Sequence, residues 1–196
     1  MIRLAVDSDS AAIARIYSPA VTDHATSFEV VAPDKEEMTE RIRKISRQLP
    51  WLVREVDGTI LGYSYASAHR DRLAYQWSVD VCAYVDQNSH RRGTGRALYT
   101  SLFAVLALQG YRNAYAGVTL PNPASEGLHR AVGFTQVGVY HRVGYKLGAW
   151  HDVAWFERNL AERILDPPPP RAITALLGDP ALAEAISLGE ALKKPG

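Results

Sequence analysis

The sequence of 196 residues has little that suits a secreted, membrane-bound or nucleic-acid-binding protein. It contains one cysteine, Cys82, so it can form no intramolecular disulfide and no cysteine-based metal cage. The formal net charge is +1, whereas nucleic-acid-binding proteins usually gather a clear basic excess on one face. The start, MIRLAVDSDS, lacks the apolar core of a secretory signal, and no segment could span a bilayer. We therefore expect a cytoplasmic protein with no nucleic-acid or membrane partner.

Composition and length indicate one folded domain with a short appendage. Hydrophobic residues make up 47% and charged residues 22% of the chain, which is usual for a folded protein. After Asp166 the sequence changes to PPPP, which favours a stiff, extended linker. We expect a single domain over residues 1–165, and over 166–196 a proline-rich linker followed by a helical tail. This tail would pack on the domain or on a second subunit, or would stay partly ordered.

The spacing of apolar residues predicts strands and helices in a mixed order. DSDS offers N-cap side chains before the helical pattern of Ile13, Ile16 and Tyr17, and Asp57-Gly58 predicts a tight hairpin. Hairpins therefore occur together with crossovers, and the fold class is mixed α/β. The other predicted elements are strands at 1–6, 75–85 and 113–120 and closing strands within 136–160. The predicted helices begin near Pro33 and run through Ile45 towards Pro50, cover 94–109 before Gly110, and cover 125–133.

The segment VDVCAYVDQNSHRRGTGRALY, residues 79–99, places a glycine-containing turn between a predicted strand and a predicted helix. Free backbone N–H groups and the helix dipole make such a turn an anion site. A phosphate-loop NTPase needs a Gly-Lys-Ser/Thr ending, which RRGTGRA lacks. A dinucleotide-binding fold needs a third glycine where this chain has Leu98. The interpretation that remains is a loop for the pyrophosphate of coenzyme A.

HRRGTGRALY resembles the Q/R-x-x-G-x-G/A signature of the GNAT superfamily of acetyl-CoA-dependent N-acyltransferases, with His90 in the usual Gln/Arg place. From Ile2 to Leu160 the chain is similar in order and spacing to phosphinothricin and methionine sulfoximine N-acetyltransferases. The matching segments are PWLVREVDGTILGYSYA, RLAYQWSVDVCAYV, SHRRGTGRALYTSL, TLPNPASEGLHRAVGF and GYKLGAWHDVAWFERNL. The resemblance implies a GNAT-like, mostly antiparallel mixed sheet flanked by helices, acetyl-CoA as co-substrate, a small-molecule amine acceptor and a C2 homodimer.

The resemblance also assigns residues to the co-substrate. Asn122 matches a position whose side-chain amide holds the pantetheine arm, although Asn after Pro is also ordinary turn chemistry. Backbone groups at the end of the strand would hold the same arm, and these belong to Ala83, Tyr84 and Val85. The pyrophosphate would bind amides and basic side chains of Arg91, Arg92, Gly93, Thr94, Gly95, Arg96 and Ala97.

Two residues are candidates for proton transfer. The acceptor amine arrives as an ammonium and must lose a proton before it attacks a carbonyl. Asp80 stands where related enzymes carry Glu, so its carboxylate lies roughly 1.5 Å further back, within reach of an intervening water. His129 matches the residue that protonates the departing thiolate. The alternatives are a structural carboxylate for Asp80 and a simple hydrogen-bonding role for His129.

The acceptor pocket is assigned to three residues by the same resemblance. Arg72 would hold the carboxylate or the tetrahedral head of the acceptor, and Phe28 and Tyr75 would form walls. Residues 69–71, His-Arg-Asp, are candidates for solvated loop positions. Acidic acceptors suit these arginines, whereas a cationic acceptor would need more acids near the motifs than the sequence offers.

The aromatic segment GYKLGAWHDVAWF leaves two interpretations open. Trp150, Trp155 and Phe156 belong either to the core or to a dimer face. His151 and Asp152 have no third converging ligand, so we predict no metal site. Two alternatives to the amino-acid N-acetyltransferase also remain: a non-catalytic acetyl-CoA-binding regulatory module, and an N-acetyltransferase for a polyamine, an aminoglycoside or a protein N-terminus.

Overall fold

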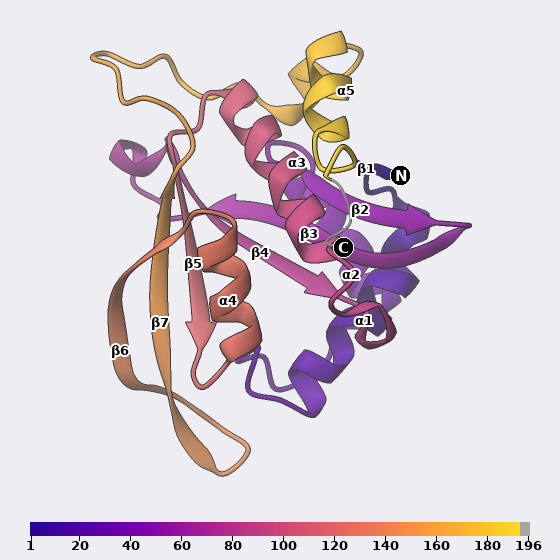
Figure 1. Cartoon of the computed structure of the whole chain (residues 1–196), viewed down its shortest axis with the longest axis vertical. Helices are drawn as coiled ribbons and strands as arrows, with labels where there is room; N and C mark the ends of the chain where they lie inside the picture. Colours follow the sequence, from indigo (N-terminus) through magenta and orange to yellow (C-terminus); the bar gives the residue numbers. More distant parts are fainter. Residues whose placement is uncertain (193–196) are drawn as a thin grey trace.

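A seven-stranded sheet runs through the molecule, with helices on both of its faces (Figure 1). This computed structural model describes residues 1–192. The strands are β1 (Ile2–Leu4), β2 (Trp51–Val56), β3 (Thr59–Ala68), β4 (Ser78–Val85), β5 (Asn113–Thr119), β6 (Thr135–Lys146) and β7 (Ala149–Asn159). Their order is β1-β2-β3-β4-β5-β7-β6, and only β4 and β5 pair in parallel. The predicted mixed, mostly antiparallel sheet is therefore confirmed.

The helices divide between the two faces of this sheet (Figure 1). One buried cluster joins α1 and α2 to β2 and β3, and another joins α3 to β4, β5 and β7. The helices are α1 (Ser10–Thr22), α2 (Lys35–Ile45), α3 (Thr94–Gln109), α4 (Pro123–Ala131) and α5 (Pro180–Ser187). No helix within residues 1–192 is both long and apolar enough to cross a membrane.

Local signals explain most element boundaries. Asp34 accepts a hydrogen bond from the Glu37 amide and so begins α2, while Gly110 ends α3 with a φ of 103°. Asp57 and Gly58 both have positive φ, as a tight hairpin requires. The predicted strand at 75–85 is wrong at its start, because the chain turns through a short 3-10 helix, η2 (Leu73–Tyr75), before β4 begins.

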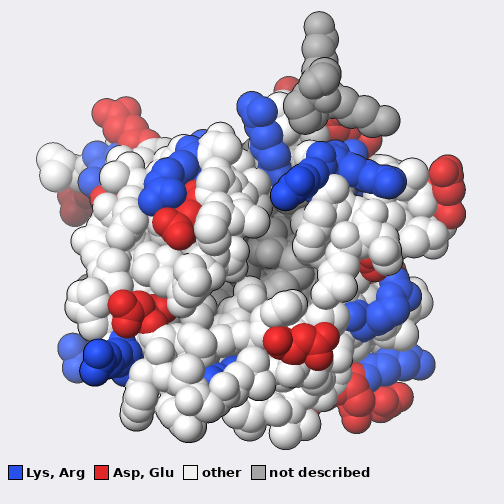
Figure 2. Space-filling view, turned by 60° about the horizontal axis from the view of Figure 1, so that its bottom comes forward, with Lys and Arg blue, Asp and Glu red and all other residues white. Residues whose placement is uncertain are grey.

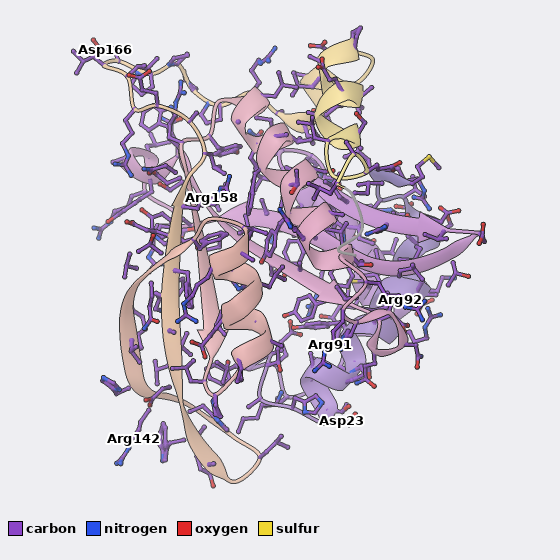
Figure 3. All side chains as sticks on the ribbon, in the orientation of Figure 1. Asp23, Arg91, Arg92, Arg142, Arg158 and Asp166 are labelled. Atoms are coloured by element: carbon purple, nitrogen blue, oxygen red, sulfur yellow. The ribbon has the colours of Figure 1, made fainter. Side chains whose placement is uncertain are left out.

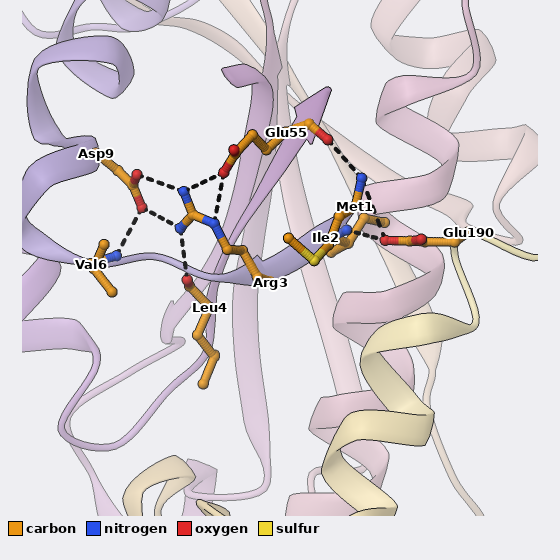
Figure 4. Close-up of polar contacts among 8 residues, drawn as sticks. All are labelled: Met1, Ile2, Arg3, Leu4, Val6, Asp9, Glu55 and Glu190. Atoms are coloured by element: carbon orange, nitrogen blue, oxygen red, sulfur yellow. Dashed lines mark hydrogen bonds and ion pairs between the residues drawn. The ribbon is translucent and has the colours of Figure 1, made fainter. Parts of the chain in front are cut away.

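The cap expected for α1 is not formed by a side chain. Instead, Asp9 accepts two hydrogen bonds from the Arg3 guanidinium, at 2.7 and 2.9 Å, and a third from the Val6 amide (Figure 4). Burial alone would raise the pKa of Asp9, but these hydrogen bonds outweigh it and hold the pKa below its usual value. Arg3 also binds Glu55, so the start of the chain is tied to β2.

The strands β4 and β5 separate soon after they begin. Their pairing covers Ser78–Asp80 against Asn113–Tyr115, and Asp80 and Tyr115 form the last pair. Beyond that pair β4 stays bonded to β3 and β5 to β7, so the two strands diverge (Figure 1). Alternation along β4 turns Val79 and Val81 toward the core under α3, which leaves Asp80 on the opposite face, the face that α1 and α2 cover.

The segment after the proline run packs on the domain. The short helix η4 (Ile173–Leu176) and α5 bury Ile173, Leu176, Leu182 and Ala185 against Val105 of α3. Hydrogen bonds reinforce this contact, because the amide of the buried Gln109 donates to the carbonyls of Gln48 and Arg171. Of the three arrangements considered for the tail, the structure shows docking on the same chain. The last four residues of the expected tail, 193–196, lie outside the described part.

Candidate active site

The turn before α3 presents free amide groups. Arg91 and Gly93 have φ values of 59° and 76°, and this left-handed backbone turns the chain into the helix. Gly93 is the N-cap, and within residues 1–192 no side chain accepts from the first amides of α3. The buried Thr94 hydroxyl has no hydrogen-bond partner either. Free N–H groups at the positive end of a helix dipole bind anions, so the turn fits a phosphate group.

The residues predicted for this loop take different positions around it. The exposed Arg91 and Arg92 lie beside the start of α3 (Figure 3). Arg96 lines a groove of about 530 Å³ between α3 and β7, together with Arg158. The Ala97 amide donates to the Gly93 carbonyl at 2.9 Å, so the free amides are those that precede Ala97.

Two glycines bring neighbouring elements close to this turn. A Cβ on Gly95 would lie 2.9 Å from a methyl carbon of Leu128, so glycine lets α4 approach the start of α3. A Cβ on Gly62 would lie 2.8 Å from the Tyr84 carbonyl oxygen, so glycine is needed where β3 passes the end of β4. Figure 2 views the lower end of the molecule in Figure 1 and shows a hollow at the middle of this face, with Lys and Arg side chains along one side of it.

Asp80 is hydrogen-bonded to His69, a residue for which the sequence suggested a solvated loop position. The His69 Nδ1 atom donates to Asp80 Oδ1 at 2.7 Å, and the exposed fractions of the two side chains are 13% and 31%. Burial raises the pKa of Asp80, and the contact with His69 opposes that rise. The expectation of a solvated loop is therefore wrong for His69, although Arg70 and Asp71 are exposed.

Aromatic rings fix the orientation of His69. Its ring stacks on Tyr115 with 4.4 Å between centroids, and its centroid lies 6.0 Å from that of Tyr75 in an edge-on arrangement. The ring therefore reaches from the end of β3 across β4 to β5, at the level where the two strands separate. Nothing in the local sequence indicates this cluster, since it depends on the register of three strands.

His129 lies on the other face of the sheet, inside an aromatic cluster. It is 5% exposed, and its ring stacks on Phe156. Nδ1 donates to the Ser125 carbonyl at 2.7 Å, and Nε2 accepts from the Tyr99 hydroxyl at 3.0 Å. Burial lowers the pKa of His129, so the ring is neutral at pH 7. Asn122 begins the same helix, and its side-chain oxygen accepts from the Ser125 amide.

The three predicted acceptor residues do not form one cluster. Arg72 is exposed and directly precedes η2, whose Tyr75 is 44% exposed and contacts His69. Phe28 packs instead on the hairpin of β6 and β7, where a Cβ on Gly144 would overlap its ring. Tyr75 therefore lies beside the Asp80–His69 pair, whereas Phe28 contacts a different part of the sheet.

The aromatic segment near the end of the domain is divided between core and surface. Phe156 is fully buried, Trp155 is partly buried, and Trp150 is 61% exposed. Trp150 belongs to an apolar surface of half-exposed or more exposed side chains on this hairpin: Val137, Tyr140, Val143, Tyr145, Leu147 and Trp150. His151 and Asp152 form no metal cluster, since the described residues contain no group of three potential ligands.

The fold, the separated strands and the helix-capping turn define an acetyltransferase of the GNAT class. The family model described as acetyltransferase (GNAT) domain matches residues 2–155, and the chain belongs to this family. The resemblance inferred from its motifs is confirmed.

Several similar relatives carry names of phosphinothricin or methionine sulfoximine acetyltransferases. Phosphinothricin N-acetyltransferase of Streptomyces viridochromogenes is 34% identical over 175 residues, which cover 89% of this chain and 95% of that protein. The enzyme of the same name from Alcaligenes faecalis is 40% identical, covering 81% and 82%. L-methionine sulfoximine/L-methionine sulfone acetyltransferase of Salmonella typhimurium is 31% identical, covering 82% and 95%. The crystal structure of a phosphinothricin acetyltransferase from Sinorhizobium meliloti in complex with AcCoA has a TM-score of 0.80, with 31% identity and coverage of 86% and 95%.

Proposed function

We propose that the protein transfers the acetyl group of acetyl-CoA to the amino group of a small amino-acid-like acceptor of the phosphinothricin or methionine sulfoximine or sulfone type. One observation carries this proposal. The Asp80 carboxylate stands at the last pair before β4 and β5 separate, and the other end of β4 leads into the turn with free amides. A proton acceptor and an anion site are therefore joined by one strand.

The residues around the turn fit acetyl-CoA, which supplies an acetyl group activated as a thioester. The amides of Thr94, Gly95 and Arg96 would hold the pyrophosphate, and Arg91 and Arg92 would add positive charge. Backbone groups of residues 83–85 would hold the pantetheine arm, because β4 has no neighbour on the side of β5 there. The unpartnered Thr94 hydroxyl supports this assignment.

Asp80 and His129 divide the proton transfers in this proposal. Asp80 draws a proton from the acceptor ammonium, directly or through one relay, so that the amine can attack the thioester carbonyl. The C–N bond forms, the C–S bond breaks, and a proton joins the departing sulfur. His129 is our candidate on the leaving-group side, where Tyr99 shares its Nε2 atom. The two residues lie on opposite faces of the sheet, which suits a base and an acid that act on opposite sides of one carbonyl.

The acceptor would lie on the face of Asp80. Arg72 is exposed, so its planar guanidinium is free to bind a carboxylate with two hydrogen bonds. Phe28 and Tyr75 would enclose the acceptor from two sides. A C2 homodimer would cover the apolar surface of the β6 and β7 hairpin, since Trp150 and its neighbours are too exposed for a core. The single free thiol, Cys82, suits the reducing cytoplasm, where we place the protein.

A thiol-release screen with purified protein and acetyl-CoA tests this function. Phosphinothricin, methionine sulfoximine and methionine sulfone should release coenzyme A, whereas a polyamine and an aminoglycoside should not. Asp80→Ala should lower turnover by about 100-fold or more and leave acetyl-CoA binding, measured by calorimetry, nearly unchanged. Asp166→Asn at an exposed position is the control and should behave as the wild type, because Asn removes the charge and tolerates the left-handed backbone there.

Three outcomes would contradict the proposal. Unchanged turnover in Asp80→Ala would remove the carboxylate from the reaction. Binding of acetyl-CoA without thiol release from any amine would favour a regulatory module. Turnover only with cationic amines would assign the protein to another class of acceptor.

A further inference from the structure

We propose that His69 is the relay between Asp80 and the acceptor, so that the imidazole takes the proton from the ammonium while Asp80 orients it. This inference rests on the proposed function and identifies the proton acceptor within it. The pair would act as an Asp–His dyad, in which a carboxylate fixes the tautomer of the imidazole and stabilises the imidazolium that forms.

The hydrogen bond between the two side chains determines which nitrogen is free. A carboxylate oxygen can only accept, so at 2.7 Å from Asp80 Oδ1 the Nδ1 atom of His69 carries the hydrogen. In the neutral ring Nε2 then keeps its lone pair. No hydrogen bond engages Nε2 within residues 1–192, so this nitrogen is available to a ligand.

The surroundings hold the ring at the place where the strands open. His69 follows the end of β3, yet its ring stacks on Tyr115 of β5 and meets the ring of Tyr75. Asp80 and Tyr115 are the last paired residues before β4 and β5 diverge. With 13% of its side chain exposed, His69 is largely shielded from bulk water but not fully buried.

The contact with His69 compensates for the short side chain of Asp80. Asp80 replaces the longer Glu of related enzymes, so its own oxygen lies roughly 1.5 Å further back and would need a bridge. The imidazole is already bonded to that oxygen and extends the reach by a hydrogen bond and the width of a ring. A bonded, stacked side chain is a more ordered bridge than a water molecule, because its position requires no immobilisation during the reaction.

The charged and polar groups around the ring come from three elements of the fold. Asp80 faces the ring from β4, Tyr115 from β5 and Tyr75 from η2. Arg70 donates to the His69 carbonyl and is exposed, and Glu157 of β7 pairs in register with Tyr115. An imidazolium at this position would therefore have the Asp80 carboxylate in direct contact, while the cation Arg70 is exposed to water.

The proton balance of the step is simple. One proton passes from the acceptor ammonium to Nε2, and the freed lone pair forms the C–N bond with the acetyl carbonyl carbon. The C–S bond breaks with its electron pair on sulfur, and the second proton lost by nitrogen balances the one that sulfur takes up. His69 then returns its proton to water. No oxidant, reductant or metal is consumed.

Two substitutions separate a proton acceptor from a residue that only holds Asp80. His69→Asn keeps a donor near Nδ1 but has no base, whereas His69→Gln places its amide near Nε2. If His69 accepts the proton, both variants should lose about 100-fold or more in kcat/KM. The acidic limb of the pH profile should also move to lower pH in any residual activity, because a carboxyl titrates below an imidazole. His69→Asn with wild-type kcat/KM, or with an unmoved acidic limb, would overturn the proposal.

A second measurement tests the Asp80–His69 dyad without relying on turnover. In ¹⁵N NMR of the free protein, at a pH where the ring is neutral, His69 should carry its hydrogen on Nδ1, and Asp80→Asn should change that tautomer. A His69 with hydrogen on Nε2 would overturn the proposal even if the enzyme is active. Absence of turnover in the wild type would instead contradict the proposed function, whatever the tautomer. Calorimetric binding of acetyl-CoA by His69→Asn should match the wild type and shows that the variant is folded.

Discussion

Leu176→Ala tests whether the segment after the proline run belongs to the core of the domain. Leu176 is fully buried in the small cluster that joins η4 and α5 to α3. The substitution removes three buried carbon atoms, which are worth about 2.4 kcal/mol in transfer free energy, and leaves a cavity. We therefore expect the free energy of unfolding to fall by about 3 kcal/mol. With a urea dependence of about 2 kcal/mol per molar, the midpoint should fall by about 1.5 M.

The next residue supplies the control. Leu177 is 60% exposed, so Leu177→Ala should change the free energy of unfolding by less than about 0.5 kcal/mol. Urea unfolding followed by circular dichroism and by tryptophan fluorescence compares both variants with the wild type. Equal, small shifts for Leu176→Ala and Leu177→Ala would refute the reasoning, because the docked segment would then contribute nothing to the stability of the domain.

Three further predictions concern backbone space and pH. Gly62→Ala forces a Cβ against a backbone carbonyl and should lower the free energy of unfolding by about 1–3 kcal/mol in urea titrations. Gly127→Ala lies at an exposed position of α4 with open space around it, so it should raise the free energy of unfolding by about 0.5–1 kcal/mol. Because burial lowers the pKa of His129, unfolding takes up a proton, so stability should fall as the pH drops below about 6.5. His129→Phe should remove that part of the slope in urea titrations between pH 7 and pH 5. The lowered pKa of Asp9 stabilises the fold above about pH 4, so Arg3→Met should move acid unfolding, followed by circular dichroism, to higher pH.

Local chemistry made the glycine-containing turn before α3 predictable. Gly93 begins α3 and Gly110 ends it, and both have left-handed backbone conformations that glycine adopts easily. Both glycines can be identified from the sequence alone. The hairpin at Asp57-Gly58 and the cap of α2 at Asp34 follow from similar short-range rules. The family resemblance then implied a mixed, mostly antiparallel sheet, which spacing alone does not determine.

Contacts between distant residues were not predictable in the same way. The sequence suggests that Asp9 caps a helix, but in the structure its carboxylate accepts hydrogen bonds from the Arg3 guanidinium instead. His69 looks like a solvated loop residue until the register of β3 and β4 brings it to Asp80. The sequence of the tail indicates a helix. Its packing on α3 depends on a buried cluster around Val105 that forms only in the folded domain.

The separation of β4 and β5 gives the sheet a pair of unpaired strand edges in its interior. Edges at the rim of a sheet can pair with another molecule and start aggregation. These interior edges are flanked by β3 on one side and by β7 on the other, so a second copy of the chain cannot lie alongside them as it could at a rim. Under the proposed function, the backbone groups along these edges would bind a slender ligand without the usual risk of intermolecular pairing.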